Sequence, residues 1–375
     1  MPPVVIDLRS AEDSRDCIHR AVQALAEGKV VAFPTETVYG VAASALSETA
    51  VNRLVKAGLT SSKQPLTLAV KSADEALDYV PNLSPLGERL ARRCWPGPVT
   101  LVLEDSHPDS LLRQLCPAVR KALAPNGAIG LRAPAHQAIL DVLRLLAGPV
   151  VLTAARREGQ PDAITAQQVI EQLNDDVQLV LDDGRSRFGQ PSSVVRVHER
   201  DFDVLQLGVV SEQTLKRLAS LIVLFVCTGN TCRSPMAEGM FRQALAKRIG
   251  CQPGELEDRG VVVMSAGIAA MLGGRGAAEA VEVMSRSGID ISAHESQPLT
   301  EQLVRHADLI LAMTRSHRKA ILAEWPEAEP RVRLLSADGA DVPDPIGGPV
   351  EQYQRCVAQM APEVEAWAAE IASKL

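Results

Sequence analysis

Residues 221–235 read LIVLFVCTGNTCRSP, an apolar run that passes through a short polar loop into a helix signal. The seven-residue apolar run from Leu221 to Cys227 predicts a strand over residues 221–226, of the kind that is buried on both faces of a sheet. Gly229 permits a tight turn, and Ser234 followed by Pro235 favours a helix start, because serine caps helices and proline fits the first turn. The stretch therefore predicts a strand–loop–helix unit of an α/β domain.

The same alternation continues after this unit. Further strand-like runs cover residues 261–265, 309–313 and 331–335, with helical patterns between them and after the last one. This order favours one parallel sheet with helices on both faces. A polar, helix-compatible stretch at 211–220 precedes the apolar run, so we place the second domain over residues 221–375 and the first over residues 1–215.

The first domain also alternates strand and helix patterns, which predicts a second α/β domain with a twisted sheet. Asp16 to Glu27 has helical apolar spacing and is followed by Gly28, a residue that commonly ends helices. Strand-like runs occur at residues 29–33, 65–70, 99–104, 128–132, 149–152, 177–181 and 193–197.

The loop after Cys227 has the features of an oxyanion site. A loop between a buried strand and a helix start points backbone N–H groups and the positive helix end into one concavity. The helix terminus and Arg233 favour the thiolate form of Cys227, which makes this residue a candidate nucleophile. The planar guanidinium of Arg233 can donate two hydrogen bonds to a phosphoryl group.

Residues 227–234 resemble the C-x5-R-S signature of the low-molecular-weight protein phosphatase family. The resemblance extends over residues 221–375 and includes Ser265-Ala266-Gly267, Pro298-Leu299-Thr300 and Asp344-Pro345. It implies that Cys227 attacks phosphorus, Arg233 clamps the phosphoryl group, and Asp344 protonates the leaving group and then activates water. It also implies a phosphorylated protein as substrate, and neither a cofactor nor a metal ion for this domain. The implied phosphate and substrate loop consists of Thr228, Gly229, Asn230, Thr231, Cys232 and Ser234; Ser234 would hydrogen-bond the thiolate and Asn230 would brace the loop.

Thr231 bears on the leaving group. Tyrosine-directed members of the family carry a larger aliphatic residue here, whereas the branch resembling protein-arginine phosphatases carries threonine, whose hydroxyl can meet a guanidinium. Ile346 stands where many relatives have an aromatic residue, which disfavours phosphotyrosine but also departs from the arginine enzymes. Phosphoarginine is the favoured substrate and phosphotyrosine the next. Cys232 has two interpretations, a reversible disulfide partner of Cys227 and a small apolar filler.

Several short motifs of the first domain are similar, in their order, to the YrdC-like threonylcarbamoyl-AMP synthase family: PTETVYG at 34–40, Lys56, Pro65-Leu66, WPGPVT at 95–100, Arg132-Ala133-Pro134 and Ser192-Ser193. That family joins threonine, bicarbonate and ATP on the route to N6-threonylcarbamoyladenosine of tRNA, so the resemblance implies these partners, with Mg accompanying ATP. The candidate ligand-binding residues are Thr35, Thr37, Tyr39, Lys56, Arg132, Ser192 and Ser193, which supply hydroxyl groups and positive charge. Without the ordered set, the preferred interpretation of Lys56 is a solvated charge on a helix.

The first domain departs from this family at three polar positions. Gly58 stands where the family has an arginine, Ala154-Ala155-Arg156 replaces Ser-Ala-Asn, and Gln206 replaces an arginine before the late glycine. We therefore expect the domain to keep the fold and nucleotide or threonine binding, with weak or no synthase activity. Two alternatives are a non-catalytic nucleotide-, threonine- or RNA-binding module that regulates the phosphatase, and an active enzyme of tRNA threonylcarbamoyladenosine biosynthesis.

Composition limits the remaining classes of function. The 375 residues suit two to three domains of about 150 residues each. The net charge of −7 and the 3% of aromatic residues argue against bulk binding of nucleic acid. The first sixteen residues contain no basic region followed by an apolar core, and no run approaches a membrane span, so a cytoplasmic protein without membrane attachment is expected. Seven scattered cysteines favour reduced thiols over a disulfide framework.

Overall fold

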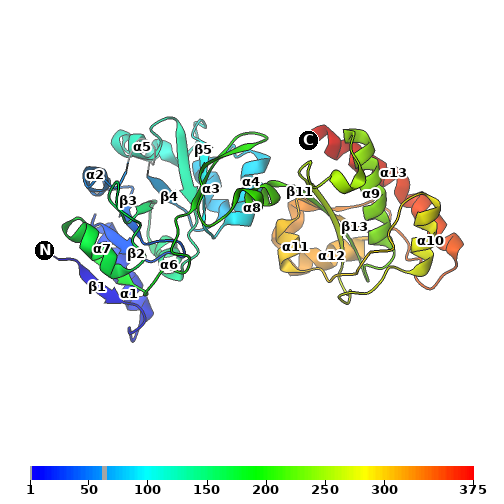
Figure 1. Ribbon diagram of the computed structural model, residues 1–375, viewed down its shortest axis with the longest axis horizontal. Coiled ribbons are helices and arrows are strands. Elements are labelled where there is room, and N and C mark those ends of the chain that lie inside the picture. Colours follow the sequence, from blue (N-terminus) through cyan, green and yellow to red (C-terminus); the bar gives the residue numbers. More distant parts are fainter. Residues whose placement is uncertain (1, 61–65) are drawn as a thin grey trace. The chain divides into compact units, whose positions relative to one another are not determined.

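The computed structural model describes residues 2–60 and 66–375 (Figure 1), and Pro65 of the predicted strand at 65–70 lies outside them. The chain divides into two compact units, Met1–Leu218 and Ala219–Leu375. Each unit is an α/β domain built on its own sheet. No helix among the described residues has both the length and the apolarity needed to cross a bilayer.

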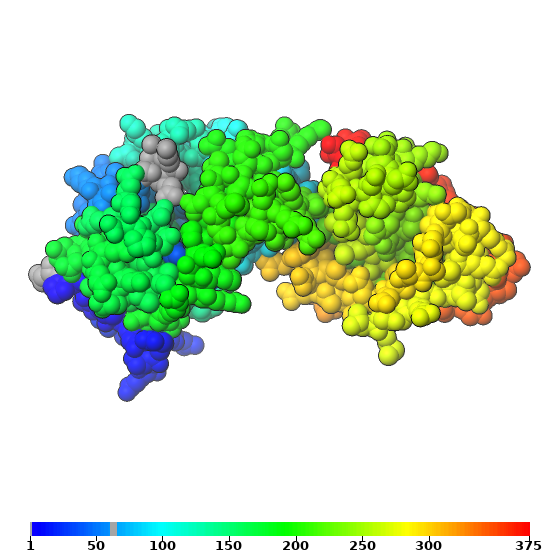
Figure 2. Space-filling model, viewed as in Figure 1, coloured from blue at the N-terminus to red at the C-terminus, as the bar shows by residue number. Residues whose placement is uncertain are grey.

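The described part of the first unit forms a ten-stranded mixed sheet in the order β1-β8-β2-β3-β7-β4-β6-β5-β9-β10. The N-terminal segment, blue in Figure 2, lies at the surface of the unit, and β1 forms one edge of the sheet. The strands are β1 (Val4–Asp7), β2 (Val31–Phe33), β3 (Gly40–Ser44), β4 (Thr67–Ala69), β5 (Val99–Glu104), β6 (Ala128–Arg132), β7 (Val150–Ala154), β8 (Leu179–Asp182), β9 (Ser193–Val197) and β10 (Phe202–Gln206).

Helices of the first unit bury apolar side chains against this sheet. Leu25 of α1 and Ile139 of α6 belong to one buried cluster with Phe33, Leu152 and Leu181 from the strands. Side-chain caps define several helix starts; Asp13, for example, accepts a hydrogen bond from the Arg15 N–H at the start of α1. The helices are α1 (Ser14–Ala26), α2 (Glu48–Lys56), α3 (Ala73–Tyr79), α4 (Pro85–Cys94), α5 (Pro117–Leu123), α6 (Gln137–Leu145), α7 (Ala166–Leu173) and α8 (Glu212–Ala219).

The second unit contains a four-stranded sheet in the order β12-β11-β13-β14, and all of its strand pairs are parallel. Its strands are β11 (Leu221–Cys227), β12 (Val261–Gly267), β13 (Leu309–Ala312) and β14 (Val332–Leu334), and its helices are α9 (Arg233–Ile249), α10 (Ala278–Arg286), α11 (Glu301–His306), α12 (Arg315–Glu324) and α13 (Val350–Lys374). One core cluster joins the sheet to α9, α10 and α13, and a second joins it to α11 and α12. Helices therefore cover both faces, as predicted.

The strands β5, β6 and β9 have the predicted bounds, whereas β1, β3 and β10 were not anticipated. Gly40–Ser44 is made of small residues with no alternation of polar and apolar side chains, yet all five are buried in the middle of the sheet. β10 is only partly buried and pairs with β9 alone, at an edge. Neither segment carries the periodic pattern that indicates a strand, so pairing with neighbouring strands decides its structure.

Candidate functional site

Cys227 is the last residue of β11, and the loop 228–232 leads from it into α9. The residue is only 2% exposed. Its Sγ atom lies 3.0 Å from Oγ of Ser234, and the Asn230 N–H donates to the sulfur over 3.2 Å. The loop therefore curls round the sulfur and surrounds it with hydrogen-bonding groups, and the first N–H groups of α9 have no partner within the helix.

Asn230 holds the shape of this loop. It has a φ of 54°, a left-handed conformation that asparagine tolerates better than most residues. Its Nδ2 donates to Oγ of Ser234 over 2.9 Å and to Oγ of Ser265 over 2.8 Å. Its Oδ1 accepts from the Gln297 N–H over 2.9 Å, and its backbone oxygen lies 2.7 Å from Nε2 of His294. A buried polar network thus fixes the loop from several elements.

Gly267, at the end of β12, allows another strand to lie against the loop. A Cβ atom at this position would lie 2.6 Å from the carbonyl oxygen of Thr228 and 2.8 Å from the nitrogen of Asn230. Both distances are far below an ordinary carbon contact, and both atoms belong to the backbone. The close approach explains why the Ser265-Ala266-Gly267 motif ends in glycine.

Arg233 lies at the start of α9, and it is buried, with 4% exposure. Its Nη1 donates to the carbonyl oxygen of Val342 over 3.1 Å, and its Nη2 donates to Oγ1 of Thr228 over 3.3 Å. Nη2 also forms an ion pair with the carboxylate of Asp344. Within the described part of the chain, Nε has no hydrogen-bond partner. Asp344, 111 residues away in sequence, is thus brought to the same guanidinium as the loop.

His317, near the start of α12, also belongs to this site, although no motif in the sequence indicates it. Its Nε2 lies 2.9 Å from Oγ1 of Thr228. The pKa of His317 is lowered to about 4, chiefly by burial and also by the nearby positive charge of Arg233. The imidazole is therefore neutral near pH 7, which avoids a second buried cation beside Arg233.

Thr231 and Cys232 complete the loop. Thr231 is half-buried, and its carbonyl oxygen accepts from the Ala277 N–H over 2.9 Å. The Sγ of Cys232 lies 3.6 Å from Oγ1 of Thr231 and 3.7 Å from the hydroxyl of Tyr353. Burial raises the pKa of the Cys232 thiol. Cys232 is therefore held as a neutral thiol among partners from the loop and from α13.

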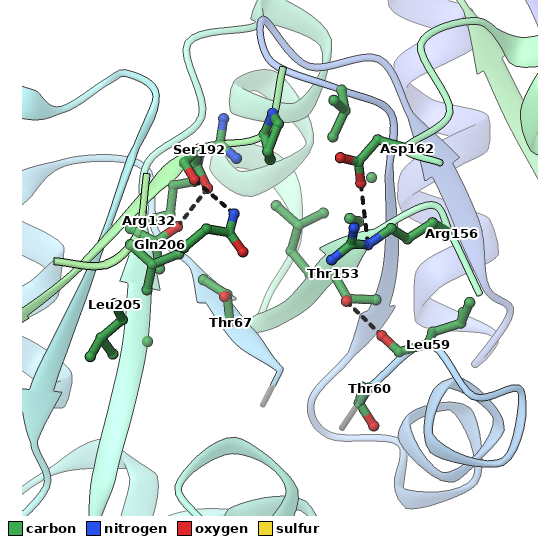
Figure 3. Close-up of a pocket in the computed structure, with 18 of the residues that line it drawn as sticks. Leu59, Thr60, Thr67, Arg132, Thr153, Arg156, Asp162, Ser192, Leu205 and Gln206 are labelled. Atoms are coloured by element: carbon green, nitrogen blue, oxygen red, sulfur yellow. Dashed lines mark hydrogen bonds and ion pairs between the residues drawn. The ribbon is translucent and has the colours of Figure 1, made fainter. Parts of the chain in front are cut away.

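The first unit contains a cavity of about 670 Å³ (Figure 3). Four of the seven predicted ligand-binding residues line it: Thr35, Tyr39, Arg132 and Ser192. Thr37 lies behind this wall, 2.9 Å from both Oγ1 of Thr35 and Nη2 of Arg132. Ser193 donates to the carbonyl oxygen of Val210 over 2.7 Å and does not line the cavity.

Lys56 is placed differently from the prediction that it supplies charge to the ligand. It is the last residue of α2, its side chain is exposed, and it is not among the residues that line the cavity. Gly58 and Thr60, a little further along the chain, do line it. Neither Gly58 nor Thr60 has a charged side chain, so neither residue supplies positive charge to this cavity.

Two arginine–carboxylate pairs lie at the cavity. Nη2 of Arg132 donates to Oε1 of Glu36 over 2.7 Å, and both side chains are buried. Nε of Arg156 lies 3.3 Å from Oδ1 of Asp162, and burial raises the pKa of Asp162. Figure 3 shows Arg156 and Asp162 directed toward each other on one side of the cavity. Glu36 stands between two predicted site residues, but nothing in the sequence links it to Arg132.

The second unit is similar to known phosphatases. The family model for low molecular weight phosphotyrosine protein phosphatases matches residues 222–375. A protein-arginine-phosphatase from Bacillus subtilis is 39% identical over 137 residues, which are 36% of this chain and 85% of that protein. A Ralstonia solanacearum protein, named as a low molecular weight protein-tyrosine-phosphatase, is 40% identical over 146 residues, 39% of this chain and 92% of the relative.

A second family model, for Sua5, YciO and YrdC and described as telomere recombination, matches residues 23–208. The threonylcarbamoyl-AMP synthase of Pyrococcus abyssi is 34% identical over 57% of this chain, which spans only 61% of that relative. A Mycobacterium tuberculosis protein named for the same synthase is 31% identical over 56% of this chain and 92% of its own length. The chain belongs to both families. It is a fusion of a YrdC-like domain and a low molecular weight phosphatase domain.

A solved structure of a Pyrococcus abyssi Sua5 variant gives a TM-score of 0.51 at 21% identity, over 88% of this chain and 98% of that one, and supports the fold alone.

Three residues of the phosphatase domain that contact the loop were not predicted from the sequence: His317, His294 and Gln297. Each reaches the loop from a distant part of the chain, and none belongs to a motif quoted above. The fold alone brings them to the loop, so no local pattern in the sequence indicates them.

Proposed function

We propose that the phosphatase domain hydrolyses phosphoarginine in proteins through a phosphocysteine intermediate. The observation that carries the choice of phosphoarginine is Thr231, which stands within the loop between Cys227 and Arg233. A threonine leaves room beside the leaving group and offers a hydroxyl that can accept from a guanidinium, whereas a larger aliphatic residue would pack on a phenol ring.

The loop is arranged to hold a phosphoryl group and to stabilise the sulfur anion. Nδ2 of Asn230 donates to Oγ of Ser234, so the hydroxyl hydrogen of Ser234 is left for the Cys227 sulfur. Together with the Asn230 N–H, it supplies two donors to a thiolate. Nε of Arg233, which has no hydrogen-bond partner among the described residues, and the first N–H groups of α9 supply donors for phosphoryl oxygens.

The proposed reaction has two steps. The Cys227 sulfur forms a bond to phosphorus as the phosphorus–nitrogen bond breaks, and Asp344 gives its proton to the departing guanidine nitrogen. Water then attacks phosphorus while Asp344 takes a proton from it, and the phosphorus–sulfur bond breaks to release inorganic phosphate. Because Asp344 is paired with Arg233, its carboxyl group must leave that guanidinium before it can reach the leaving group.

Phosphotyrosine is the second candidate substrate. Ile346, two residues after Asp344, is 59% exposed but has no aromatic ring to stack on a phenol, so the support for this candidate is the relative named as a protein-tyrosine-phosphatase. The relative named as a tyrosine phosphatase and the relative named as an arginine phosphatase have nearly equal identity to this chain, so neither decides the substrate.

One peptide made in two forms, with phosphoarginine or phosphotyrosine at the same position, tests the choice. We expect a higher kcat/KM for the phosphoarginine form, and a Thr231→Ile variant that shifts the ratio toward phosphotyrosine. Thr231→Val keeps the size and removes the hydroxyl, so it separates the effect of hydrogen bonding from that of bulk. If the full chain hydrolyses the phosphotyrosine peptide faster, the second candidate replaces the first.

For the YrdC-like domain we propose ligand binding without adenylate synthesis. The support is the lining of the cavity, where Gly58, Thr60, Ala154 and Gln206 stand and the lysine that was expected to act on the ligand lies outside. Losing such charged donors costs about 1.5–3 kcal/mol each in binding of a charged transition state. Release of pyrophosphate from ATP in the presence of threonine, bicarbonate and Mg²⁺, at the rate of a working family member, would refute this proposal.

A further inference from the structure

We propose that a groove on the phosphatase domain binds an acidic segment of the protein substrate, away from the catalytic loop. This groove, called here the α12 groove, lies between α12, β14, the loop after β14 and α13, and has a volume of about 810 Å³. The inference rests on the proposed action of this domain on phosphorylated proteins and adds a second point of contact. The lining residues that decide its chemistry are Arg315, Arg318, Lys319, Leu322, Arg333 and Trp367.

One side of α12 forms a wall of the groove. Four lining residues at helix positions i, i+3, i+4 and i+7 share this side: Arg315, Arg318, Lys319 and Leu322. His317 is buried on the opposite side of the helix, where its Nε2 lies 2.9 Å from Oγ1 of Thr228 in the catalytic loop. The helix therefore serves the catalytic loop with one side and the groove with the other.

The floor of the groove is apolar. Trp367 of α13 is half-buried, and its Nε1 donates to the carbonyl oxygen of Leu335 over 2.9 Å, which holds the indole ring in place. Leu322 and Leu334 are also half-buried lining residues. Among the described strands, β14 pairs with β13 alone, so no strand covers its outer edge. An apolar side chain of a partner can therefore be buried here.

The rim of the groove is cationic. Among the described residues, the lining includes four cationic side chains and no anionic one. The second unit as a whole contains 15 Lys and Arg residues against 20 Asp and Glu residues, so this concentration of positive charge is local. A local cationic rim attracts a short acidic segment, whereas the net negative charge of the domain opposes a long polyanion such as RNA. Charge complementarity therefore favours an acidic peptide.

Two of the cations are available to a partner. Lys319 is exposed and forms no ion pair within the described chain. Arg333 is exposed as well, and its Nη1 donates only to the backbone carbonyl oxygens of Glu329 and Val332, each over 3.1 Å. A carboxylate of a partner can bind either side chain without displacing a carboxylate of this chain.

The carboxylates around the groove are held by other groups and do not line it. Asp341 accepts from the backbone N–H and the guanidinium of Arg315, and Glu329 lies 3.5 Å from Arg318. Two others accept from backbone N–H groups over 2.8 and 3.0 Å: Asp338 and Glu363. Glu329 is 69% exposed at its side chain, so a carboxylate of a partner can replace it at little cost.

A short stretch of chain joins the groove to the catalytic site. Ser336 lines the groove, and Asp344, the proposed general acid, follows eight residues later. Eight residues span at most about 29 Å when fully extended, so one extended peptide of about ten residues can reach both places. A segment bound in the groove therefore raises the local concentration of the phosphorylated residue near Cys227, which lowers KM and leaves kcat unchanged.

Fluorescence anisotropy of the full chain with a labelled, unphosphorylated peptide tests binding in the groove. The peptide has acidic residues on both sides of one leucine, and a matched peptide has glutamine at each acidic position. Saturating orthovanadate occupies the catalytic loop, so the result does not depend on the proposed substrate. We expect the acidic peptide to bind at least about ten-fold more tightly than the glutamine peptide. Equal affinities, or tighter binding of an RNA oligonucleotide of the same length, would overturn the proposal.

Charge reversal at the groove tests where the peptide binds. The double variant Lys319→Glu/Arg333→Glu should bind the acidic peptide at least about ten-fold more weakly, and both positions are exposed, so the fold should persist. Lys247→Glu/Arg259→Glu is the control, because it makes the same change in net charge at exposed positions that do not line the groove. It should bind the peptide as the wild type does. Equal weakening in both double variants would overturn the assignment to the groove.

Kinetics test whether the groove serves the substrate. A phosphoarginine peptide with the acidic segment about ten residues from the phosphorylated residue should have a KM about five-fold lower than its glutamine counterpart, at equal kcat. The difference should disappear in Lys319→Glu/Arg333→Glu, whose turnover of para-nitrophenyl phosphate should equal that of the wild type. A difference in KM that persists in this variant would overturn the proposal. If neither peptide is hydrolysed, the proposed function fails, and the anisotropy measurement still decides whether the groove binds acidic peptides.

Discussion

The carboxylate of Asp344 forms an ion pair with the guanidinium of Arg233, the group that closes the loop around Cys227. The general acid proposed for the phosphatase domain thus occupies a nitrogen that a phosphoryl oxygen would use. When a substrate binds, its phosphoryl group must replace the Asp344 carboxylate on Arg233. Removing this carboxylate should therefore strengthen the binding of anions while it slows turnover.

Asp344→Asn is expected to bind orthovanadate about three- to ten-fold more tightly, because no carboxylate competes for Arg233, and to lower kcat about 10²–10⁴-fold, because the proton donor is lost. Calorimetric titration with vanadate and steady-state kinetics on the phosphoarginine peptide measure the two effects. Asp338→Asn, at an exposed position in the same loop, is the control. Weaker vanadate binding in Asp344→Asn would contradict competition between the two anions.

Cys227→Ser and Cys227→Ala are expected to lose more than about 10³-fold in kcat, since no other group is proposed to attack phosphorus. The fold should persist, because both replacements are smaller than or equal to cysteine in size. Activity on the phosphorylated peptide and circular dichroism of the full chain are the measurements. Retention of wild-type turnover in either variant would remove the proposed mechanism.

His317 is expected to make the stability of the phosphatase domain depend on pH. Its pKa is about 4 in the folded chain and near 6.5 when unfolded, so between these values the unfolded chain binds a proton that the folded chain does not. The free energy of unfolding should therefore fall as pH decreases from 6.5 to 4, by no more than about 3 kcal/mol from this group. Scanning calorimetry of the full chain measures it, and the transition that vanadate raises belongs to this domain.

His317→Gln is the matched variant, because glutamine can still bond Thr228 but takes up no proton in this range. It should flatten the pH dependence of that transition between pH 6.5 and 4. An identical dependence in wild type and variant would show that another group is responsible.

Gly267→Ala is expected to disturb the loop more than the fold. The added Cβ would meet the backbone of Thr228 and Asn230, so the loop must shift. We expect a loss of about 1–3 kcal/mol in stability and a larger proportional loss in kcat/KM. Gly254→Ala is the control, since nothing lies within 4 Å of the position a Cβ would take there. Equal kinetics in the two variants would contradict the close approach.

An oxidation experiment distinguishes the two proposed roles of Cys232, a disulfide partner of Cys227 and a small apolar filler. If it forms a disulfide with Cys227, hydrogen peroxide should inactivate the wild type reversibly, and dithiothreitol should restore activity. Cys232→Ala should then lose activity irreversibly under the same treatment. If Cys232 is only an apolar filler, the wild type and Cys232→Ala should recover to the same extent. Recovered activity after peroxide and reductant is the measurement.

The sequence predicted those helices and strands whose apolar runs, caps and turn residues lie next to one another in the chain. The strand at Leu221–Cys227 and the helix that follows it are encoded by an apolar run, a serine and a proline that are adjacent in sequence. The buried strand Gly40–Ser44 was not predicted, because its conformation depends on pairing with β2 and β7.

The sites were predictable only where their residues lie in one motif. The loop 227–234 is such a case. His317 contacts Thr228 across 89 residues and Glu36 contacts Arg132 across 96, so no local spacing reveals either pair. Lys56 was assigned by its place in an ordered set of motifs, but the end of α2 directs its side chain to solvent rather than into the cavity.

The long last helix, α13, packs against α9 through Tyr353 and Met360, and the hydroxyl of Tyr353 reaches Cys232. Domains form from the N-terminal side during synthesis, so β11, Cys227 and α9 emerge from the ribosome well before this support does. A nascent chain that still lacks residues 342–375 has the nucleophile but neither the Val342 carbonyl that holds Arg233 nor Asp344. The phosphatase site should therefore become complete only after residues 342–375 have been synthesised and have packed against α9.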